Sequence, residues 1–277
     1  IAVAVVPKHQ FEIIKYALEN KIAVFAEKPL TTNFETSLEL CQLAQKNQLP
    51  NMVDFEFPAI PQWIHAKNIL ENKEIGEILS IELHWNFLSY DLANNIKSWK
   101  TDIEQGGGAL SLVFSHTFYY LEHLVGKIKN IECSLVSSHK SLNKADTTIN
   151  MKLLFENGCN GEIFVDISND KDPKHTLKFF GSEGTLSLEN LSSDMVDNFN
   201  LKLSKNYESQ NISIAQKLNF LKDENEDPRI KVVANLTQKF VKWYNTGIPE
   251  KPNFEDGLRV QELIQMARIS NKGEKTL

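Results

Sequence analysis

The chain has 277 residues, of which 42% are hydrophobic and 24% are charged, a composition typical of an ordinary globular protein. Its 30 basic and 36 acidic side chains give a net charge of −6 without a basic cluster, so we expect no nucleic-acid partner. The sequence shows neither a signal peptide nor an apolar run near the roughly 18 residues of a membrane span, which predicts no membrane association. The cysteines at positions 41, 133 and 159 share no metal-ligand spacing and favour a reduced, cytoplasmic compartment.

The chain opens directly inside an apolar, strand-like segment at residues 1–6. Residue 1 is Ile rather than Met, and a parallel strand at this position needs neighbours that cover its edges. We therefore expect an amino-terminal part of the protein to precede Ile1. The length also favours two domains over one.

The first 57 residues alternate between predicted parallel strands and helices. Pro7 ends the first strand, and a helix follows at residues 11–20. A short β-branched run at residues 22–26 predicts a buried strand, which completes a βαβ unit with a right-handed crossover. The predicted core face of the helix consists of Phe11, Ile14, Ala17 and Leu18.

A second helix is predicted at residues 34–47, with Thr32 or Asn33 as its cap. Its core face is expected to hold Leu38, Leu43 and Ala44. A third strand at residues 52–57 is closed by prolines at positions 58 and 61. We place a domain boundary after residue 57.

The second part, residues 58–277, is predicted to be rich in antiparallel strands. It begins with a helix at residues 61–71 and a half-buried strand at 77–86, and a polar loop at 89–105 leads to three glycines and a long helix that ends at Gly126. Strands follow at residues 131–137, 147–155, 161–168, 176–181 and 185–191, and Asn157-Gly158 is the sharpest hairpin signal. Amphipathic helices at 229–246 and 256–271 close the chain. The fold class is therefore a doubly wound α/β domain joined to an α+β domain.

The second predicted strand ends abruptly in Glu27, Lys28 and Pro29. Side chains at the carboxyl end of a parallel strand face the crevice in which open α/β sheets bind ligands. Pro29 removes a ladder donor and fixes the direction in which the chain leaves the strand. A solvated Glu–Lys pair is the simpler interpretation, but the position and the proline favour a functional site.

The helix after Gly106-Gly107-Gly108 carries the other candidate for chemistry. Three glycines before a helix allow a close approach of the backbone and leave free N–H groups at the positive end of the helix dipole. His116 lies on this helix, and histidine is the commonest proton-transfer residue near neutral pH. A hydrogen-bonded core histidine is the alternative interpretation. His123 shares its face, but no carboxylate completes a zinc site, so we predict no metal.

The order of these motifs resembles the Gfo/Idh/MocA oxidoreductases, the family of glucose–fructose oxidoreductase and inositol dehydrogenase. The motifs are a strand before Pro7, the Glu27-Lys28-Pro29 strand end, the three glycines before the helix of His116, Gly181-Ser182-Glu183-Gly184, and a late helix containing Asp256-Gly257. Together they span essentially the whole chain. The resemblance implies an amino-terminal Rossmann domain for NAD or NADP and a carboxyl-terminal α+β domain whose open sheet supports oligomers.

The resemblance also implies that this chain starts late in the Rossmann domain. The Gly-x-Gly-x-x-Gly loop that grips the pyrophosphate is not found in these 277 residues, so we expect the chain alone to bind dinucleotides poorly and to be inactive. Trp99 and Lys100 stand where many members have Trp-Arg, close to the cofactor phosphates.

Roles around the second strand follow from the same resemblance. Lys28 matches the family lysine near the nicotinamide and the reacting hydroxyl, and Glu27 matches a residue that contacts the cofactor ribose. Pro29 completes this cofactor-binding motif. Pro7 matches a proline beside the nicotinamide, although the asparagine that usually follows it is Lys8 here.

His116 matches the histidine that the family uses as proton acceptor from the substrate hydroxyl. The aspartate usually found four residues earlier is Leu112 here, and an acid usually found three residues later is Tyr119. The expected catalytic set is therefore Lys28 and His116, with Tyr119 or Tyr120 as helper.

The implied activity is transfer of a hydride between NAD or NADP and a hydroxyl or carbonyl group of a sugar, sugar derivative or polyol. A pocket for this carbohydrate substrate is expected among Trp63, His84, Trp85, Asn86 and Tyr90, although strand packing explains Trp85 equally well.

Two other classes of function stay open. One is a non-catalytic fragment or degenerate paralogue that keeps the fold as an interaction protein, which Leu112 favours. The other is a sugar-binding module that uses the sheet domain alone. The strands from residue 131 to 191 offer more faces than the few helices cover, which predicts an exposed apolar face and a homodimer or homotetramer built through it.

Overall fold

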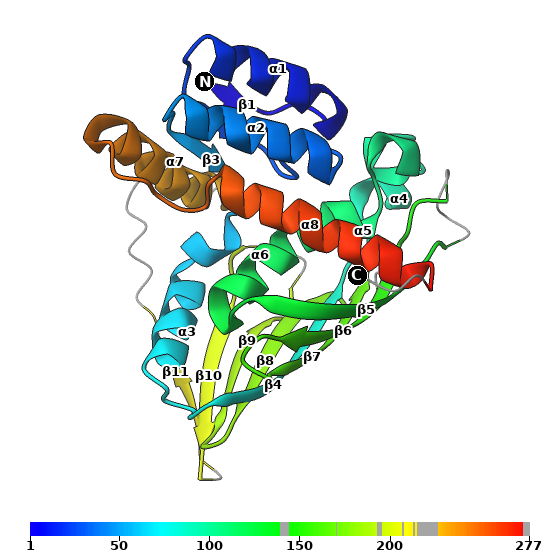
Figure 1. The fold of residues 1–277 in the computed structure, drawn as a ribbon. Helices are drawn as coiled ribbons and strands as arrows, with labels where there is room; N and C mark the ends of the chain where they lie inside the picture. Colours follow the sequence, from blue (N-terminus) through cyan, green and yellow to red (C-terminus); the bar gives the residue numbers. More distant parts are fainter. Residues whose placement is uncertain are drawn as a thin grey trace.

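Two sheets organise the chain in the computed structural model, which describes residues 1–138, 144–169, 171–192, 196–206, 208–212, 214 and 227–273. A three-stranded parallel sheet lies at the amino-terminal end and a large eight-stranded sheet makes up most of the rest (Figure 1). The predicted combination of an α/β part with an α+β part is confirmed. Within the described part of the chain, no helix is both long and apolar enough to cross a membrane.

The small sheet has the order β1-β2-β3, with β1 at Ala2–Val3, β2 at Val24–Ala26 and β3 at Asn51–Val53. Helices α1 (Pro7–Glu19) and α2 (Phe34–Lys46) connect these strands, as the βαβ pattern predicted. Pro7 opens α1, where its missing N–H is tolerated, so the helix starts four residues earlier than predicted. On α2, Asn33 is the cap, and the buried face centres on Leu40 and Cys41 rather than on the expected Leu38 and Leu43.

The third strand ends earlier than its apolar pattern suggested. Pairing stops at Val53, and the backbone N–H of Asp54 donates to the carbonyl of Ala26 at 2.9 Å. The chain then turns into a short 3-10 helix, η1, at Phe57–Ala59. Asp54 and Glu56 therefore lie beyond the sheet, at its carboxyl edge.

The large sheet has the order β11-β10-β9-β8-β4-β7-β6-β5. Its strands are β4 (Ile78–Asn86), β5 (Ile128–Val136), β6 (Thr148–Phe155), β7 (Asn160–Asp166), β8 (Lys174–Gly181), β9 (Thr185–Asn190), β10 (Asn200–Lys205) and β11 (Glu208–Ile212). The β4 strand lies at the centre, parallel to β7 and antiparallel to β8. The Asn157-Gly158 hairpin joins β6 to β7, as predicted. Strands β10 and β11 were not predicted. Strand β11 is polar and lacks an apolar alternation, whereas β10 does alternate, at Leu201 and Leu203, and was overlooked.

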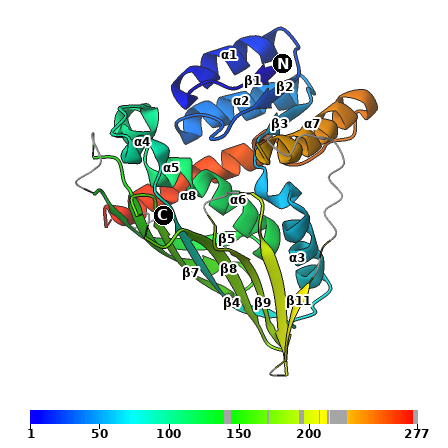
Figure 2. The same cartoon turned by 180° about the vertical axis from the view of Figure 1, so that it is seen from behind.

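Helices cover the inner face of this sheet (Figure 2). They are α3 (Pro61–Glu71), α5 (Ala109–Leu112), α6 (Phe114–Val125) and, along β5, α8 (Phe254–Asn271). The single long helix expected after the glycines is broken at Val113 into α5 and α6. The loop expected at residues 89–105 contains a short helix α4 (Tyr90–Ala93) and two 3-10 turns, η2 (Trp99–Thr101) and η3 (Ile103–Gln105).

The opposite face of the sheet is mixed, because charged side chains interrupt the expected apolar face, on which Phe164 and Phe180 are half-buried. Exposed Glu82, His84, Lys152 and Glu162 lie on neighbouring strands of this face, and Lys152 stands directly opposite Glu162. Alternating charges of this kind make a solvated surface.

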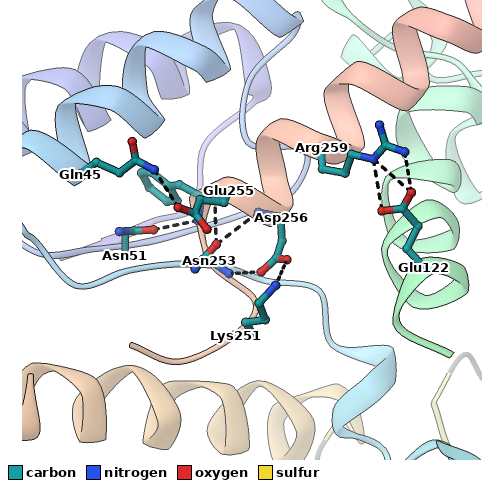
Figure 3. Close-up of polar contacts among 9 residues, drawn as sticks. Gln45, Asn51, Glu122, Lys251, Asn253, Glu255, Asp256 and Arg259 are labelled. Atoms are coloured by element: carbon teal, nitrogen blue, oxygen red, sulfur yellow. Dashed lines mark hydrogen bonds and ion pairs between the residues drawn. The ribbon is translucent and has the colours of Figure 1, made fainter. Parts of the chain in front are cut away.

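Helix α8 ties the two sheets together (Figure 3). At its start, the backbone N–H of Phe254 donates to Asn51 Oδ1 on β3 at 2.8 Å. Further along, Arg259 forms an ion pair with Glu122 on α6, with 2.8 Å between Nη2 and Oε1. Helix α7 (Arg229–Thr246) lies beside the small sheet (Figure 1), where Phe240 meets Phe25 edge to face. These contacts hold the carboxyl edge of the small sheet over the inner face of the large one.

Candidate active site

A cleft of about 1420 Å³ lies where the carboxyl ends of β2 and β3 face the inner side of the large sheet. Its walls come from the residues after β2 and β3, the end of β4 with the following loop, the α5–α6 junction, the start of β8 and the first turns of α7. Small-molecule pockets usually measure about 300–1,000 Å³, so this cleft has room for more than one small ligand.

Lys28 projects into this cleft from the end of β2. Its Nζ atom donates a hydrogen bond to the backbone carbonyl of Leu112 at 3.0 Å. Burial lowers the pKa of Lys28, while the carboxylates of Glu56, Glu27 and Asp54 act in the opposite direction. The predicted position of Lys28 at a ligand-facing strand end is where the structure places it.

Three carboxyl groups share this wall of the cleft. Glu27 was expected there, whereas Asp54 and Glu56 were assigned to a strand and missed. Asp54 is 5% exposed, and its Oδ1 atom has no hydrogen-bond partner. Burial, and then the charges of Glu56 and Glu27, raise the pKa of Asp54 to about 8. Burial also raises the pKa of Glu56. Acids that follow a buried parallel strand were the sequence signal for both residues.

His116 lines the cleft from the first turn of α6. Phe57 and Phe55 meet its ring edge to face, with centroid distances of 5.2 and 6.4 Å, and its Nδ1 atom is buried without a partner. Burial, followed by the charge of Lys28, holds the pKa of His116 well below its usual range. The imidazole is therefore neutral at neutral pH and free to accept a proton.

A second histidine, His175 on β8, was missed. Its ring stacks on Trp85 at 4.1 Å between centroids, and its Nε2 atom lies 3.2 Å from the hydroxyl of Tyr120. Burial lowers the pKa of His175 to about 3. A sequence signal was present. Side chains alternate between the two faces of a strand, and His175 lies two and four residues before the buried Leu177 and Phe179, so it points inward as they do.

The glycines before α5 allow the close approach that was predicted, but their N–H groups are not free. The N–H groups of Gly107 and Gly108 donate to the carbonyls of Asp102 and Lys100, and the next two N–H groups donate to the backbone carbonyl and a side-chain oxygen of Asp146. A Cβ atom on Gly108 would lie 2.3 Å from Asp146 Oδ1, and one on Gly107 would lie 2.0 Å from a backbone oxygen. The glycines thus allow close packing, and their N–H groups are already used within the chain.

The remaining predicted residues divide between the cleft and the core. Trp85, Asn86, Tyr90, Trp99, Lys100 and Glu27 line the cleft. Tyr119 and Tyr120 lie behind its wall: Tyr119 stacks on Phe55 at 4.7 Å, and Tyr120 contacts the lining residues His175 and Phe57. The other four predicted positions lie elsewhere: Trp63 in the core, His84 on the outer face of the large sheet, Pro7 at the start of α1, and Pro29 with its carbonyl bonded to Gln10.

Unpartnered buried polar atoms gather around the cleft. They are Asp54 Oδ1, Asn86 Oδ1, His116 Nδ1 and His175 Nδ1, and all four residues line it. Buried polar groups nearly always have a hydrogen-bond partner, so this concentration indicates a site for a polar ligand or for water. Among the residues that the structure describes, no group of three or more His, Cys, Asp or Glu side chains could hold a metal ion.

Comparison with protein families gives two matches that together cover most of the chain. Residues 1–55 match the model described as the oxidoreductase family, NAD-binding Rossmann fold, and residues 67–277 match the model for the oxidoreductase family, C-terminal alpha/beta domain.

Individual relatives are distant. An uncharacterized oxidoreductase of Synechocystis sp. is 26% identical over 98% of this chain and 76% of its own length. The D-xylose dehydrogenase of Paenarthrobacter nicotinovorans is 28% identical over 39% of this chain and 29% of its own length. The structure of levoglucosan dehydrogenase in complex with NADH and L-sorbose superposes with a TM-score of 0.85 and 19% identity, covering 99% of this chain and 78% of that chain. At that identity the superposition shows a shared fold.

Proposed function

Because the chain belongs to the Gfo/Idh/MocA oxidoreductase family, we propose that it transfers a hydride between NAD or NADP and a hydroxyl or carbonyl group of a sugar, sugar derivative or polyol. The observation that carries this proposal is that Lys28 and His116 line one cleft at the carboxyl edge of the parallel strands. We keep the division after residue 57 as part of the proposal, with the cofactor on the small sheet and the substrate against the large one.

The residues around the strand ends fit the nicotinamide end of a dinucleotide. Leu112 and Val113 supply an apolar wall for the ring, and Glu27 and Lys28 supply polar contacts for the ribose and the reacting group. Trp99 lines the same cleft. The nicotinamide would accept or donate the hydride; the protein provides orientation and electrostatics.

The substrate side of the cleft suits a polyhydroxylated compound. Asn86, His116 and His175 each present an unpartnered polar atom, and Trp85 offers an aromatic wall. A sugar combines hydroxyl groups for the first three with C–H surfaces for the fourth. D-xylose dehydrogenase among the relatives supports this substrate class.

The two named residues have complementary roles. A protonated Lys28 stabilises negative charge that develops on the substrate oxygen, and its burial strengthens that interaction. Neutral His116 can accept the hydroxyl proton when the carbonyl forms. Both side chains are held in place, Lys28 by the bond to residue 112 and His116 by the rings of Phe55 and Phe57.

The second candidate is a sugar-binding or interaction protein that keeps the fold without catalysis. The apolar Leu112 beside Lys28 favours this candidate, since it leaves α5 without a carboxylate in the cleft. Cofactor binding separates the two: a dehydrogenase binds and reduces NAD or NADP, and a sugar-binding module does neither.

The test uses the protein expressed from its complete coding sequence alongside the 277-residue chain. Titration calorimetry with NAD and NADP measures cofactor binding, and the absorbance of the reduced nicotinamide measures turnover with D-xylose, myo-inositol and related polyols. We expect binding and turnover in the complete protein and poor dinucleotide binding in the chain alone, which carries no glycine-rich phosphate loop. Sugar binding without any cofactor binding in the complete protein would favour the second candidate.

We also propose that the protein assembles into a homodimer or homotetramer through the large sheet. The outer face of the sheet carries rows of opposite charges, with Lys152 facing Glu162 across β6 and β7. An interface on this face would therefore be polar.

A further inference from the structure

Lys28 has its carboxylate neighbours on one side only. Its Nζ atom contacts α5 through the carbonyl of Leu112, and the side chain at that position is apolar. The carboxyl groups in this part of the cleft all come from the segments after β2 and β3, at residues 27, 54 and 56. Of the three, Asp54 is the most enclosed.

The backbone fixes where Asp54 lies. Ala26 pairs with Val53 in the parallel register, and the N–H of Asp54 then donates to the carbonyl of Ala26, so Asp54 follows β3 beside Glu27 and Lys28 on the neighbouring strand. Its Oδ1 atom is buried and has no hydrogen-bond partner. A carboxylate that served only the fold would have donors at such a position.

Three charged groups act directly on Asp54: Glu56, which follows β3, and Glu27 and Lys28, which follow β2. Further out, Lys100 on η2 acts on Lys28, Arg229 on α7 acts on Glu56, and the neutral His116 on α6 lines the same cleft. One lysine cannot compensate three carboxylates of which one is buried and two are half-buried, so one of them keeps its proton. Burial and the two neighbouring acids raise the pKa of Asp54 to about 8, and burial raises that of Glu56 as well. We assign the proton to Asp54 because it is the more enclosed residue and its Oδ1 atom has no hydrogen-bond partner.

We propose that Asp54 is an acid–base group of the site, exchanging a proton directly with the reacting hydroxyl beside Lys28. In the reductive direction the neutral carboxyl gives its proton to the carbonyl oxygen as that carbon receives the hydride. In the oxidative direction the O–H bond breaks, its proton passes to ionised Asp54, and the hydride leaves the carbon for the nicotinamide. Lys28 stays protonated throughout and stabilises the oxygen. This inference rests on the proposed function, and it assigns to Asp54 the proton transfer that His116 would otherwise perform.

The first test reads the protonation state without turnover. Protein labelled with ¹³C at the aspartate carboxyl carbons is titrated by NMR as wild type, Asp54→Asn and Asp172→Asn. We expect one resonance to titrate near pH 8, to vanish in Asp54→Asn and to persist in Asp172→Asn, which alters an exposed carboxylate paired with Lys174. Titration of Asp54 in the ordinary carboxyl range would overturn the proposal, whether or not the protein is a dehydrogenase.

The second test follows the pH dependence of kcat. Its substrate is whichever of D-xylose, myo-inositol and the related polyols the wild type oxidises. Asp54→Asn should lower kcat about 10²–10⁴-fold with little change in KM, and it should abolish the change of kcat with pH near pH 8, which we call the pH limb. Asp54→Glu should restore part of the lost kcat and part of this pH limb. Glu56→Gln removes a neighbouring charge, so it should move the limb to lower pH even if Asp54→Asn fails to fold.

The possible failures are distinguishable. An unchanged kcat and pH limb in Asp54→Asn would overturn the role of Asp54 and leave the dehydrogenase function standing, with His116 as the base. Absence of turnover in the wild type would overturn the proposed function itself, and the assignment of Asp54 with it.

Discussion

The Nζ atom of Lys28 donates a 3.0 Å hydrogen bond to the backbone carbonyl of Leu112, which lies 84 residues further along the chain. This bond joins the end of β2 to the last residue of α5 and places position 112 in the wall of the cleft. Leu112 is half-buried: it lines the cleft and also packs against the hydrophobic core. We therefore expect position 112 to accept a charged side chain, which a fully buried core position would not.

Leu112→Asp is expected to fold with a melting temperature close to that of the wild type. A carboxylate at this position would meet Lys28 and solvent in the cleft. Leu110→Asp is the matched control, because Leu110 is on the same helix but 1% exposed, and an unpaired carboxylate there should cost several kcal/mol, about 3 or more. Thermal unfolding of both variants checks this. Equal destabilisation of the two would show that residue 112 is core.

Asp54 should give the protein a pH-dependent stability of definite sign. Its pKa is raised from an ordinary 3.8 to about 8 in the folded state, so the folded state holds one more proton than the unfolded state between these values. That stabilisation is complete below 3.8 and is lost as the pH rises through 8. His116 and His175 have lowered pKa values and act in the opposite sense, but only below 6.5.

The window from pH 6.5 to 8 therefore isolates Asp54 from the histidines. There the free energy of unfolding of the wild type should fall relative to Asp54→Asn by up to about 1.4 kcal/mol per pH unit. Urea denaturation at several pH values measures the difference. Curves for the two proteins that run parallel across this window would contradict the raised pKa.

Gly108→Ala should destabilise the protein more than Gly158→Ala. Both glycines have positive φ, +98° and +87°, so both substitutions strain the backbone by about 1 kcal/mol. Only at Gly108 does the added Cβ meet another atom, Asp146 Oδ1 at 2.3 Å, whereas Gly158 faces open space. The clash should add about 2 kcal/mol or more in denaturant unfolding. Equal losses would mean that Asp146 can move away freely.

The oligomer proposed through the large sheet should respond to charge reversal on its outer face. Glu162→Lys would place like charges opposite Lys152 and should weaken a polar interface there. Glu12→Lys on α1, away from this sheet, is the control. Light scattering checks the assembly: we expect a dimer or tetramer that Glu162→Lys dissociates. A wild-type monomer at high concentration would end the proposal.

Elements with a strong local pattern could be predicted from the sequence. Helices α3 and α7 begin and end at the predicted residues, and the Asn157-Gly158 hairpin lies where its dipeptide placed it. Strand β11 has four exposed polar residues out of five, so only its pairing with β10 defines it. The break at Val113 lies within a continuous apolar run and leaves no mark in the sequence.

The candidate site was predictable only in part, for a related reason. Lys28 and His116 stand at positions that local patterns single out, a strand end and a helix after glycines. Asp54 and Glu56 follow a buried strand, which is a signal for both, but the alternation of apolar and acidic residues from 52 to 57 predicted a longer strand and so concealed where β3 stops pairing. His175 depends on which end of β8 reaches the cleft, and that follows from the order of strands in the sheet.

Reduction of NAD or NADP by the protein from its complete coding sequence, in the presence of a polyol, tests the central claim most directly. Wild type, Lys28→Met, His116→Gln and the surface control Lys46→Met, at the exposed end of α2, are compared for kcat and melting temperature. We expect turnover in wild type and control, a loss of about 10²–10⁴-fold in Lys28→Met, and a smaller loss in His116→Gln because Asp54 exchanges the proton. Melting temperatures should stay close together. Unchanged turnover in both Lys28→Met and His116→Gln would contradict the assignment of this cleft as the active site.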